Sequence, residues 1–207
     1  MSAITIRPAK TTDVLTIRKL VDTYAPDRRL LSKATVTLYE AVPDFLVIEN
    51  NGQVIGAGAI HVLWEDLAEV RTVAVFPEFK DKGIGSQLLE ALLRRAKELG
   101  VKRVFCLTFE TKFFAKHGFT EIEGTPVEPE IYQQLLQSYD VGVAEFLDLD
   151  KVKPNTLGNT RMIKHLQFCS KTTHHNVLLL LRQNNTTYRP NCWTFRLNLL
   201  NKSRDVL

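Results

Sequence analysis

The sequence predicts one domain of the α+β or α/β class, and two observations indicate it. Segments with the apolar pattern of strands follow one another at short intervals over residues 45–76, as in an antiparallel meander. A glycine-containing loop at residues 80–85 then opens a long amphipathic helix, after which strand and helix patterns alternate as far as residue 166. A meander followed by helix, strand, helix and strand fits a sheet that is covered by helices.

The predicted strands are short apolar or alternating segments bounded by turn residues. They are Thr5–Pro8, Phe45–Glu49, Gln53–Val62, Leu67–Phe76, Lys102–Phe109, Phe119–Glu123, Ala144–Leu149 and Asn159–Leu166. The sequence Asn50-Asn51-Gly52 is the expected hairpin turn between the second and third strands, because these residues tolerate positive φ.

The predicted helices have apolar residues at helical spacing and a recognisable start or stop. Thr11 or Thr12 is the expected cap of the first helix, Pro43 ends the second, and Gly100 and Gly118 end two later ones. The helices are a segment with apolar residues Val14, Leu15, Ile17, Leu20 and Val21, then Lys33–Val42, Ser86–Leu99, Lys112–His117 and Pro129–Ser138. Leu88, Leu89, Leu92, Leu93, Ala96 and Leu99 form the expected apolar stripe of the Ser86–Leu99 helix.

The composition is that of a globular protein. The 207 residues are 44% apolar and 24% charged, which excludes disordered and collagen-like chains. The longest aliphatic run is Val177–Leu181, far below the roughly 20 residues that cross a bilayer, and no apolar leader pattern opens the chain. The three cysteines lie far apart and cannot form an even disulfide framework. We therefore expect a cytoplasmic protein without a membrane partner.

The positive charge is concentrated at the C-terminal end. Residues 167–207 hold six basic residues and one acid, which leaves 21 basic and 22 acidic residues in 1–166, a net charge of −1. A neutral body offers no polyanion-binding face, so no nucleic-acid partner is expected. We interpret residues 1–166 as the domain and residues 167–207 as a basic, asparagine-rich, poorly ordered extension.

The loop Lys80-Asp81-Lys82-Gly83-Ile84-Gly85-Ser86 is the most informative segment. Glycines let backbone N–H groups surround an anion, and the following helix adds the positive end of its dipole. The loop lacks the Gly-Lys-Ser/Thr ending of a P-loop and the third glycine of a Rossmann fingerprint. Taken alone, it is equally consistent with a tight turn between a strand and a helix.

Three segments together resemble the GNAT N-acetyltransferases. The loop resembles the family's motif A, [Gln/Arg]-x-x-Gly-x-[Gly/Ala], with Lys80 in the first position. The segment Leu67–Val75 resembles the family's central strand, and Phe113–Phe119 resembles its Phe-Tyr-x-x-x-Gly-Phe signature. The resemblance implies the GNAT fold, a mixed, mostly antiparallel sheet flanked by helices, and acetyl-coenzyme A as co-substrate without a metal. The residues implied for this ligand are Val73, Ala74 and Val75 for pantetheine, and Lys80, Asp81, Lys82, Gly83, Ile84, Gly85 and Ser86 for pyrophosphate.

Within that family the chain is most similar to the short, standalone form of bacterial N-acetylglutamate synthases. The similar segments include residues 28–49, 68–77, 101–127 and 138–162. The resemblance implies acetylation of the α-amino group of an amino acid, glutamate before others, in arginine biosynthesis. The sequence does not give the oligomeric state, and a homodimer is one alternative. Alternatives that stay open are another amine, such as a protein N-terminus or a polyamine, and a non-catalytic acyl-CoA-binding protein.

Acetyl transfer to an amine needs a group that accepts the amine's proton. Glu69 stands where several GNAT enzymes carry that base, although a solvent-side charge at the start of a strand is equally consistent. Arg71 lies between apolar neighbours and either pairs with an internal acid or binds a substrate carboxylate, and the resemblance favours the second. The resemblance also points to Lys33 as a carboxylate-binding residue, and Arg161 is a further candidate.

Other chemistry-bearing residues favour structural roles. Cys106 lies in an apolar run and fits a core position better than a nucleophile, and His117 fits a partly exposed helix end. Phe114 occupies the position of the tyrosine that many GNAT enzymes use as general acid, so the acid is unassigned. The remaining histidines and cysteines show no zinc-ligand spacing, so no metal is expected.

Overall fold

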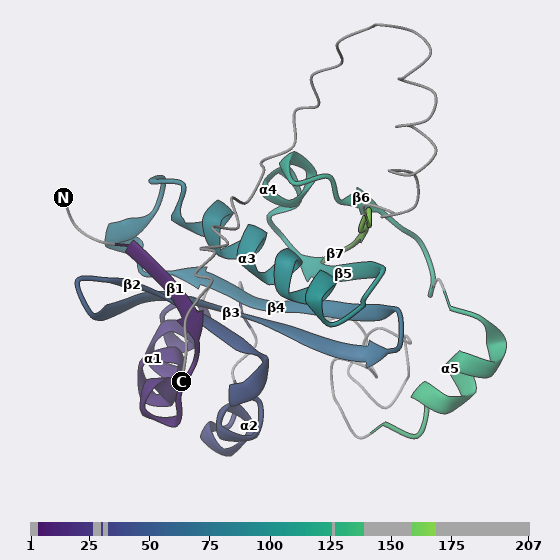
Figure 1. The fold of residues 1–207 in the computed structure, drawn as a ribbon, viewed down its shortest axis with the longest axis horizontal. Coiled ribbons are helices and arrows are strands. Elements are labelled where there is room, and N and C mark those ends of the chain that lie inside the picture. Colours follow the sequence, from purple (N-terminus) through teal and green to yellow (C-terminus); the bar gives the residue numbers. More distant parts are fainter. Residues whose placement is uncertain (1–3, 27–29, 31–32, 126, 139–158, 169–207) are drawn as a thin grey trace, which may run out of the picture. The chain divides into compact units, whose positions relative to one another are not determined.

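The computed structural model describes residues 4–26, 30, 33–125, 127–138 and 159–168. Contacts along the chain divide it into two units, Met1–Phe168 and Cys169–Leu207, and the second unit lies outside the described residues. In the first unit, the described strands form one mixed sheet with helices on both faces (Figure 1), as the sequence predicts.

The seven strands of the described sheet run in the order β1-β2-β3-β4-β5-β7-β6. They are β1 (Ile4–Pro8), β2 (Phe45–Asn50), β3 (Gln53–Trp64), β4 (Leu67–Val75), β5 (Arg103–Thr108), β6 (Thr120–Glu121) and β7 (Thr160–His165). Strands β4 and β5 pair in parallel and the other neighbours pair antiparallel. The predicted turn between β2 and β3 is confirmed, with φ of 51° at Asn51 and 79° at Gly52. The predicted strand Ala144–Leu149 lies outside the described residues.

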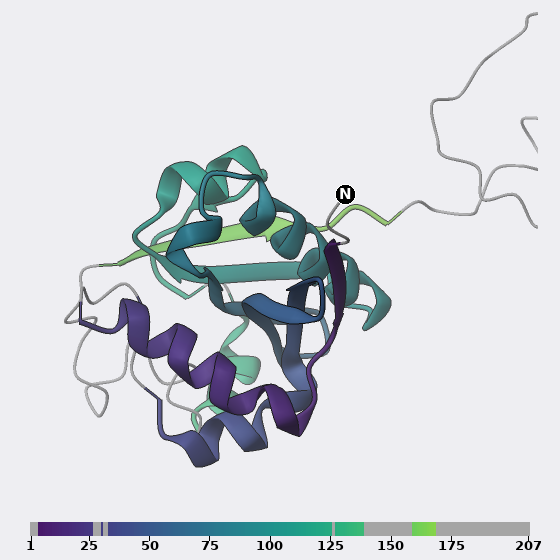
Figure 2. The ribbon, with the colours of Figure 1, turned by 90° about the vertical axis from the view of Figure 1, so that its left-hand side faces the viewer.

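The helices divide between the two faces of the sheet. They are α1 (Val14–Tyr24), α2 (Thr35–Glu40), α3 (Ile84–Glu98), α4 (Thr111–Lys116) and α5 (Pro129–Leu135), with short 3-10 turns η1 (Thr11–Asp13), η2 (Val42–Asp44) and η3 (Pro77–Phe79). Helices α1 and α2 lie on one side of the sheet and α3 on the other (Figure 2). The apolar side of α1 packs on β2 and β3, and that of α3 packs on the opposite faces of β3, β4 and β5.

Three helix predictions need correction. Leu15 is 67% exposed, because the stripe that faces the sheet follows the helical spacing of Val14, Ile17 and Val21. Leu99 is 44% exposed, because it follows the last turn of α3. Neither predicted threonine caps α1. Instead the Asp13 carboxylate accepts a hydrogen bond from the backbone N–H of Lys10 at 2.7 Å.

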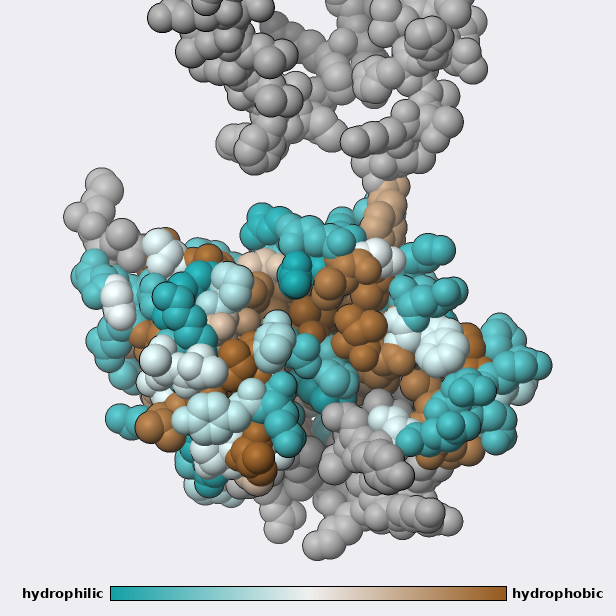
Figure 3. Space-filling view, turned by 60° about the horizontal axis from the view of Figure 1, so that its bottom comes forward, coloured by the Kyte–Doolittle hydropathy of each residue, from teal (hydrophilic) through white to brown (hydrophobic). Residues whose placement is uncertain are grey.

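The surface mixes apolar and hydrophilic residues. Figure 3 turns the lower side of Figure 1 toward the viewer and shows apolar residues reaching the surface between hydrophilic ones. Within the part of the chain that the structure describes, every helix is too short or too polar to cross a membrane.

Candidate active site

The sheet divides where β4 leaves β5. Their parallel pairing begins where Leu67 lies opposite Arg103, and it ends where Glu69 lies opposite Phe105. Beyond this point β4 stays paired with β3 as far as Val75, whereas β5 stays paired with β7 as far as Thr108. Within the described sheet, the edge of β4 that faces β5 therefore carries strand hydrogen bonds only up to Glu69. An extended ligand arm would pair with such a strand edge through backbone hydrogen bonds.

A β-bulge bends β4 at this division. Ala57 pairs with Ala74 and Ala59 pairs with Arg71, so the single residue Gly58 lies opposite both Thr72 and Val73. Thr72 has φ of 55°, which is rare for a β-branched residue and is a form of strain that clusters at functional sites. A Cβ at Gly58 would lie 2.8 Å from Leu92 Cδ1, so the Leu92 side chain of α3 packs closely on the backbone of this glycine. The sequence analysis did not predict the bulge.

The loop before α3 has the geometry of an anion site. Asp81 (φ 59°) and Gly83 (φ 73°) adopt left-handed conformations, and Gly83 is the N-cap of α3. The first bond of the helix joins Gln87 N–H to Gly83 O at 3.1 Å. The N–H groups of Ile84, Gly85 and Ser86 therefore precede the intrahelical bonds, and within the described residues no side chain caps this end. Such an end binds a phosphate group well.

The predicted ligand-binding residues follow one another along this path. Val73, Ala74 and Val75 form the C-terminal end of β4, and residues 80–86 form the loop and the first turn of α3. Both basic side chains of the loop contact neighbouring residues. Lys80 Nζ lies 4.6 Å from the centre of the Tyr24 ring, and Lys82 Nζ donates to Glu78 O at 2.9 Å. Their role toward a ligand stays a prediction.

Glu69 and Arg71 form a buried ion pair beside the division of the sheet. Arg71 Nε donates to Glu69 Oε2 at 2.5 Å, and the two side chains are 12% and 7% exposed. The interpretation of Glu69 as a solvent-side charge is therefore wrong. For Arg71 the internal pair, the less favoured of the two interpretations, is present. A guanidinium has further N–H donors beyond Nε, so binding of a substrate carboxylate by Arg71 stays a prediction.

A histidine that the sequence analysis overlooked lies next to this pair. His61 on β3 is the cross-strand partner of Glu69, so both side chains lie on the same face of the sheet. Its Nδ1 is 2.6 Å from Asp44 Oδ2 in η2. The Asp44 contact favours a proton on Nδ1, which makes Nε2 the basic nitrogen of the neutral ring. Simple counting outward from the pair of Trp64 and Leu67 would place His61 opposite Val70. A register shift between Val62 and Trp64 moves it opposite Glu69.

The other predicted substrate residues are distributed around the same face. Arg161 on β7 lies opposite Leu107 on β5. Leu107 faces the same side of the sheet as Phe105, the partner of Glu69, so Arg161 and Glu69 share a face. Lys33 is half-buried and lies just before α2, one of the helices on this side of the sheet. The structure thus brings Glu69, Arg71 and Arg161 to one face, and their roles stay predictions.

The residues interpreted as structural have structural surroundings. Cys106 is 1% exposed, and burial, together with the charge of Glu69, raises the pKa of its thiol far above the ordinary value. A protonated, buried thiol is a poor nucleophile, so the core interpretation is confirmed. His117 ends α4 and its Nε2 lies 3.1 Å from Ser86 Oγ, while Phe114 packs in the core. Among the described residues, no cluster of three or more His, Cys, Asp or Glu side chains could hold a metal.

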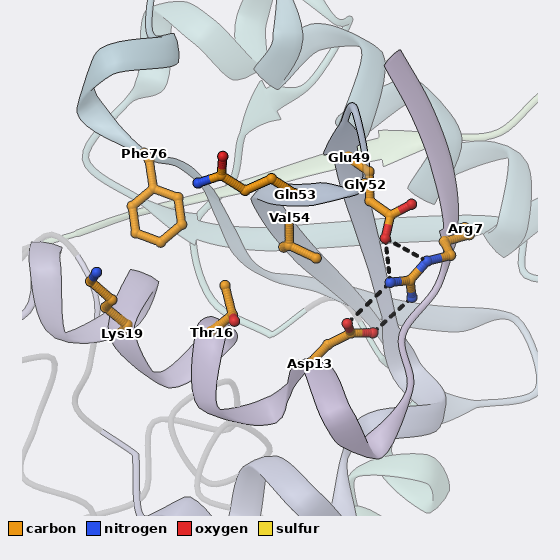
Figure 4. Close-up of a pocket in the computed structure, with 9 residues that line it drawn as sticks. All are labelled: Arg7, Asp13, Thr16, Lys19, Glu49, Gly52, Gln53, Val54 and Phe76. Carbon is orange, nitrogen blue, oxygen red and sulfur yellow. Dashed lines mark hydrogen bonds and ion pairs between the residues drawn. The ribbon is translucent and has the colours of Figure 1, made fainter. Parts of the chain in front are cut away.

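A separate cavity of about 390 Å³ lies between α1 and the β2–β3 turn. Figure 4 shows Arg7 at its rim, between Asp13 and Glu49. Arg7 donates to both carboxylates, at 2.7 Å to Asp13 Oδ2 and at 2.9 Å to Glu49 Oε1. Arg7 thus pairs with both carboxylates inside the protein, and the cavity contains none of the predicted site residues.

Comparison with known proteins agrees with this geometry. The Acetyltransferase (GNAT) family profile matches residues 16–119. The chain is 58% identical over 161 residues to the amino-acid acetyltransferase of Mycobacterium tuberculosis, covering 76% of this chain and 92% of that protein.

Solved structures share the fold. The crystal structure of Rv2747 from Mycobacterium tuberculosis, in complex with CoA, superposes with a TM-score of 0.76 at 57% identity and covers 79% of this chain and 99% of that one. N-acetylglutamate synthase from Neisseria gonorrhoeae, complexed with coenzyme A and N-acetyl-glutamate, has a TM-score of 0.65 at 21% identity and covers 81% of this chain and 36% of that one, which indicates a shared fold. The divided sheet and the glycine loop before α3 agree with the profile match and with the identity to a known acetyltransferase. This chain therefore belongs to the GNAT family of acetyltransferases.

Proposed function

We propose that this protein transfers the acetyl group of acetyl-CoA to the α-amino group of an amino acid, and that the amino acid is L-glutamate. The buried pair of Glu69 and Arg71 carries this proposal. A carboxylate that can take up a proton and a guanidinium that can bind a carboxylate lie next to each other where β4 leaves β5. The 58% identity to an amino-acid acetyltransferase supports the same reaction.

The chain's own groups fit acetyl-CoA along β4 and the loop. The backbone of residues 73–75 would bind the pantetheine arm, and the N–H groups of Ile84 to Ser86 with Lys80 would bind the pyrophosphate. When bound, acetyl-CoA supplies the activated acetyl group. Arg71 keeps Glu69 ionised, and the ionised carboxylate accepts a proton from the substrate ammonium, directly or through water. The neutral amine is then the nucleophile.

Several finer points belong to the same proposal. We place the reaction in the cytoplasm and in arginine biosynthesis. The support for these points is the resemblance to standalone N-acetylglutamate synthases. The buried Cys106 thiol is compatible with a reducing compartment.

The substrate is tested by measuring CoA release from acetyl-CoA with each of the common amino acids. We expect glutamate to give the highest kcat/KM. If glutamine or another amino acid exceeds it, the choice of glutamate is wrong, although amino-acid acetylation would stand. If no amino acid supports turnover above the hydrolysis background, the proposed function is wrong.

The acetyl-CoA loop is tested with a matched pair of glycines at the two ends of α3. Gly83 (φ 73°) and Gly100 (φ 87°) are both left-handed with open space around an added Cβ, so alanine strains both similarly. Gly83→Ala should raise KM for acetyl-CoA, whereas Gly100→Ala should lower Tm comparably and leave KM unchanged. At Gly85 an added Cβ would lie 3.7 Å from the Phe113 ring, so Gly85→Val should fold and lose acetyl-CoA affinity. Unchanged affinity in both loop variants would contradict the assignment of the loop.

A further inference from the structure

Tyr24, the last residue of α1, touches both segments to which the proposed function assigns acetyl-CoA. Its hydroxyl donates a hydrogen bond of 2.5 Å to Val75 O at the end of β4. Its ring lies under the ammonium of Lys80, with Nζ 4.6 Å from the ring centre. Tyr24 is 8% exposed, so its hydroxyl bond to Val75 is buried, whereas Lys80 is an exposed residue that reaches over the ring. One side chain therefore connects the end of the central strand to the first residue of the loop.

The hydroxyl contact sets the position of the strand end. Val75 is the last residue of β4, and the chain turns directly afterwards, with Phe76 N–H donating to Ile55 O at 2.9 Å. A buried tyrosine hydroxyl needs a hydrogen-bond partner, and here that partner is a backbone carbonyl of another segment. Phenylalanine would fill the same space in this cluster, so the hydroxyl adds the position of one peptide group to the packing.

The ring contact sets the position of the loop cation. A lysine side chain has many rotamers, and each binding event must order it. Lys80 Nζ over the Tyr24 ring is a cation–π contact, which restricts the ammonium before a ligand arrives. A cation held in place in advance costs less entropy on binding than a mobile one.

We infer that Tyr24 is a positioning residue for the acetyl donor, acting on pantetheine through Val75 and on pyrophosphate through Lys80. This inference rests on the proposed function, which assigns those two groups to the strand and the loop. Tyr24 itself acts through its neighbours.

The test separates the two contacts with two variants and two donors. Tyr24→Phe removes the hydroxyl and keeps the ring, whereas Tyr24→Leu removes both. Acetyl-CoA carries a pyrophosphate, and S-acetylpantetheine carries only the pantetheine arm. Tyr24→Phe should raise KM for both donors by about two- to tenfold, the range for one lost hydrogen bond, at unchanged kcat. Tyr24→Leu should raise KM for acetyl-CoA by a further two- to fivefold, roughly, and add no further loss with S-acetylpantetheine.

Two controls separate positioning from folding and from the proposed function. Phe45→Leu changes another buried residue of the same cluster, and it should lower Tm without changing KM for either donor. Lys80→Met should raise KM for acetyl-CoA, and in that background Tyr24→Leu should be no worse than Tyr24→Phe. If Lys80→Met leaves KM unchanged, the assignment of the loop fails.

The inference on Tyr24 has its own failing results. It is overturned if Lys80→Met raises KM while both Tyr24 variants lower only Tm. It is also overturned if the step from phenylalanine to leucine costs the same with both donors. Should Tyr24→Leu not fold, the values for Tyr24→Phe with the two donors still decide, because a purely structural hydroxyl would leave both KM values unchanged.

Discussion

Two arginines on the same sheet bind carboxylates, and their surroundings differ. Arg7 joins three separate segments, because it lies on β1 and bonds Asp13 of η1 and Glu49 of β2. Arg71 bonds Glu69, its neighbour on the same strand, where β4 parts from β5. The first cluster ties the edge of the sheet to the start of α1, and the second lies where the pairing of β4 with β5 ends. The same residue types thus serve stability at one place and, in our proposal, chemistry at the other.

The largest expected effect separates the two clusters by activity. Glu69→Gln keeps the shape of the side chain and removes its capacity to accept a proton. We expect kcat at neutral pH to fall by roughly 10²- to 10⁴-fold and to recover partly at high pH, where more substrate amine is unprotonated. Glu49→Gln is the matched control in the Arg7 cluster and should leave kcat unchanged. A pH-independent loss of less than about threefold in Glu69→Gln would show that Glu69 is not the base.

The second effect concerns the stability of the Glu69–Arg71 pair. Removing one member of a buried ion pair leaves an uncompensated charge, which typically costs about 3–5 kcal/mol. Arg71→Met should therefore lower the free energy of unfolding by that order, and adding Glu69→Gln should recover part of the loss. Urea denaturation of the two single variants and the double variant measures this coupling. Losses that simply add would mean that the two side chains do not depend on each other.

The third effect is the pH dependence that Arg7 contributes. The hydrogen bond from Arg7 lowers the pKa of Asp13 below the ordinary value of 3.8. A carboxyl with a lowered folded-state pKa stabilises the protein fully above its unfolded value, and this stability is lost as the pH falls through the folded value. Arg7→Met should cost about 1.5–3 kcal/mol at neutral pH and flatten the fall of Tm in acid. An equally steep acid profile in Arg7→Met would contradict this account.

The smallest effect is expected at the end of the domain. Leu166 is 7% exposed and its N–H donates to Lys102 O at 2.7 Å, so the described core reaches this residue. We propose that residues 167–207 are an appendage, and a chain that ends after Leu166 should keep its activity and Tm nearly unchanged. A large drop in Tm would show that the removed segment packs against the domain.

Sequence patterns predicted the elements well and the site only in part. The apolar spacing of α3 up to Ala96, the Asn51–Gly52 turn and the strand patterns within the described residues are local features, and the structure confirms them. The bulge at Thr72 has no such signal, because threonine rarely takes positive φ and the bulge depends on pairing with β3. The contact of His61 with Asp44 also depends on tertiary packing.

The Glu69–Arg71 pair lies between these two cases. Positions two apart on a strand share a face, so the pair was within reach of sequence reasoning. That reasoning kept an internal acid as the less favoured alternative for Arg71 but did not identify the acid as Glu69. The contacts of Tyr24 were beyond it, because they join α1 to segments more than fifty residues away in sequence.

The central claim is that Arg71 binds a carboxylate of the amino-acid substrate. The most direct test compares kcat/KM of the wild-type protein and Arg71→Ala for glutamate, glutamine and isoglutamine. Glutamine has an amide in place of the side-chain carboxylate, and isoglutamine has an amide in place of the α-carboxylate. An indirect loss through Glu69 would slow all three substrates by the same factor. We predict a fall of roughly 10- to 150-fold for glutamate, and a much smaller fall for the amide that lacks the carboxylate bound by Arg71. Equal losses for all three substrates would contradict the claim.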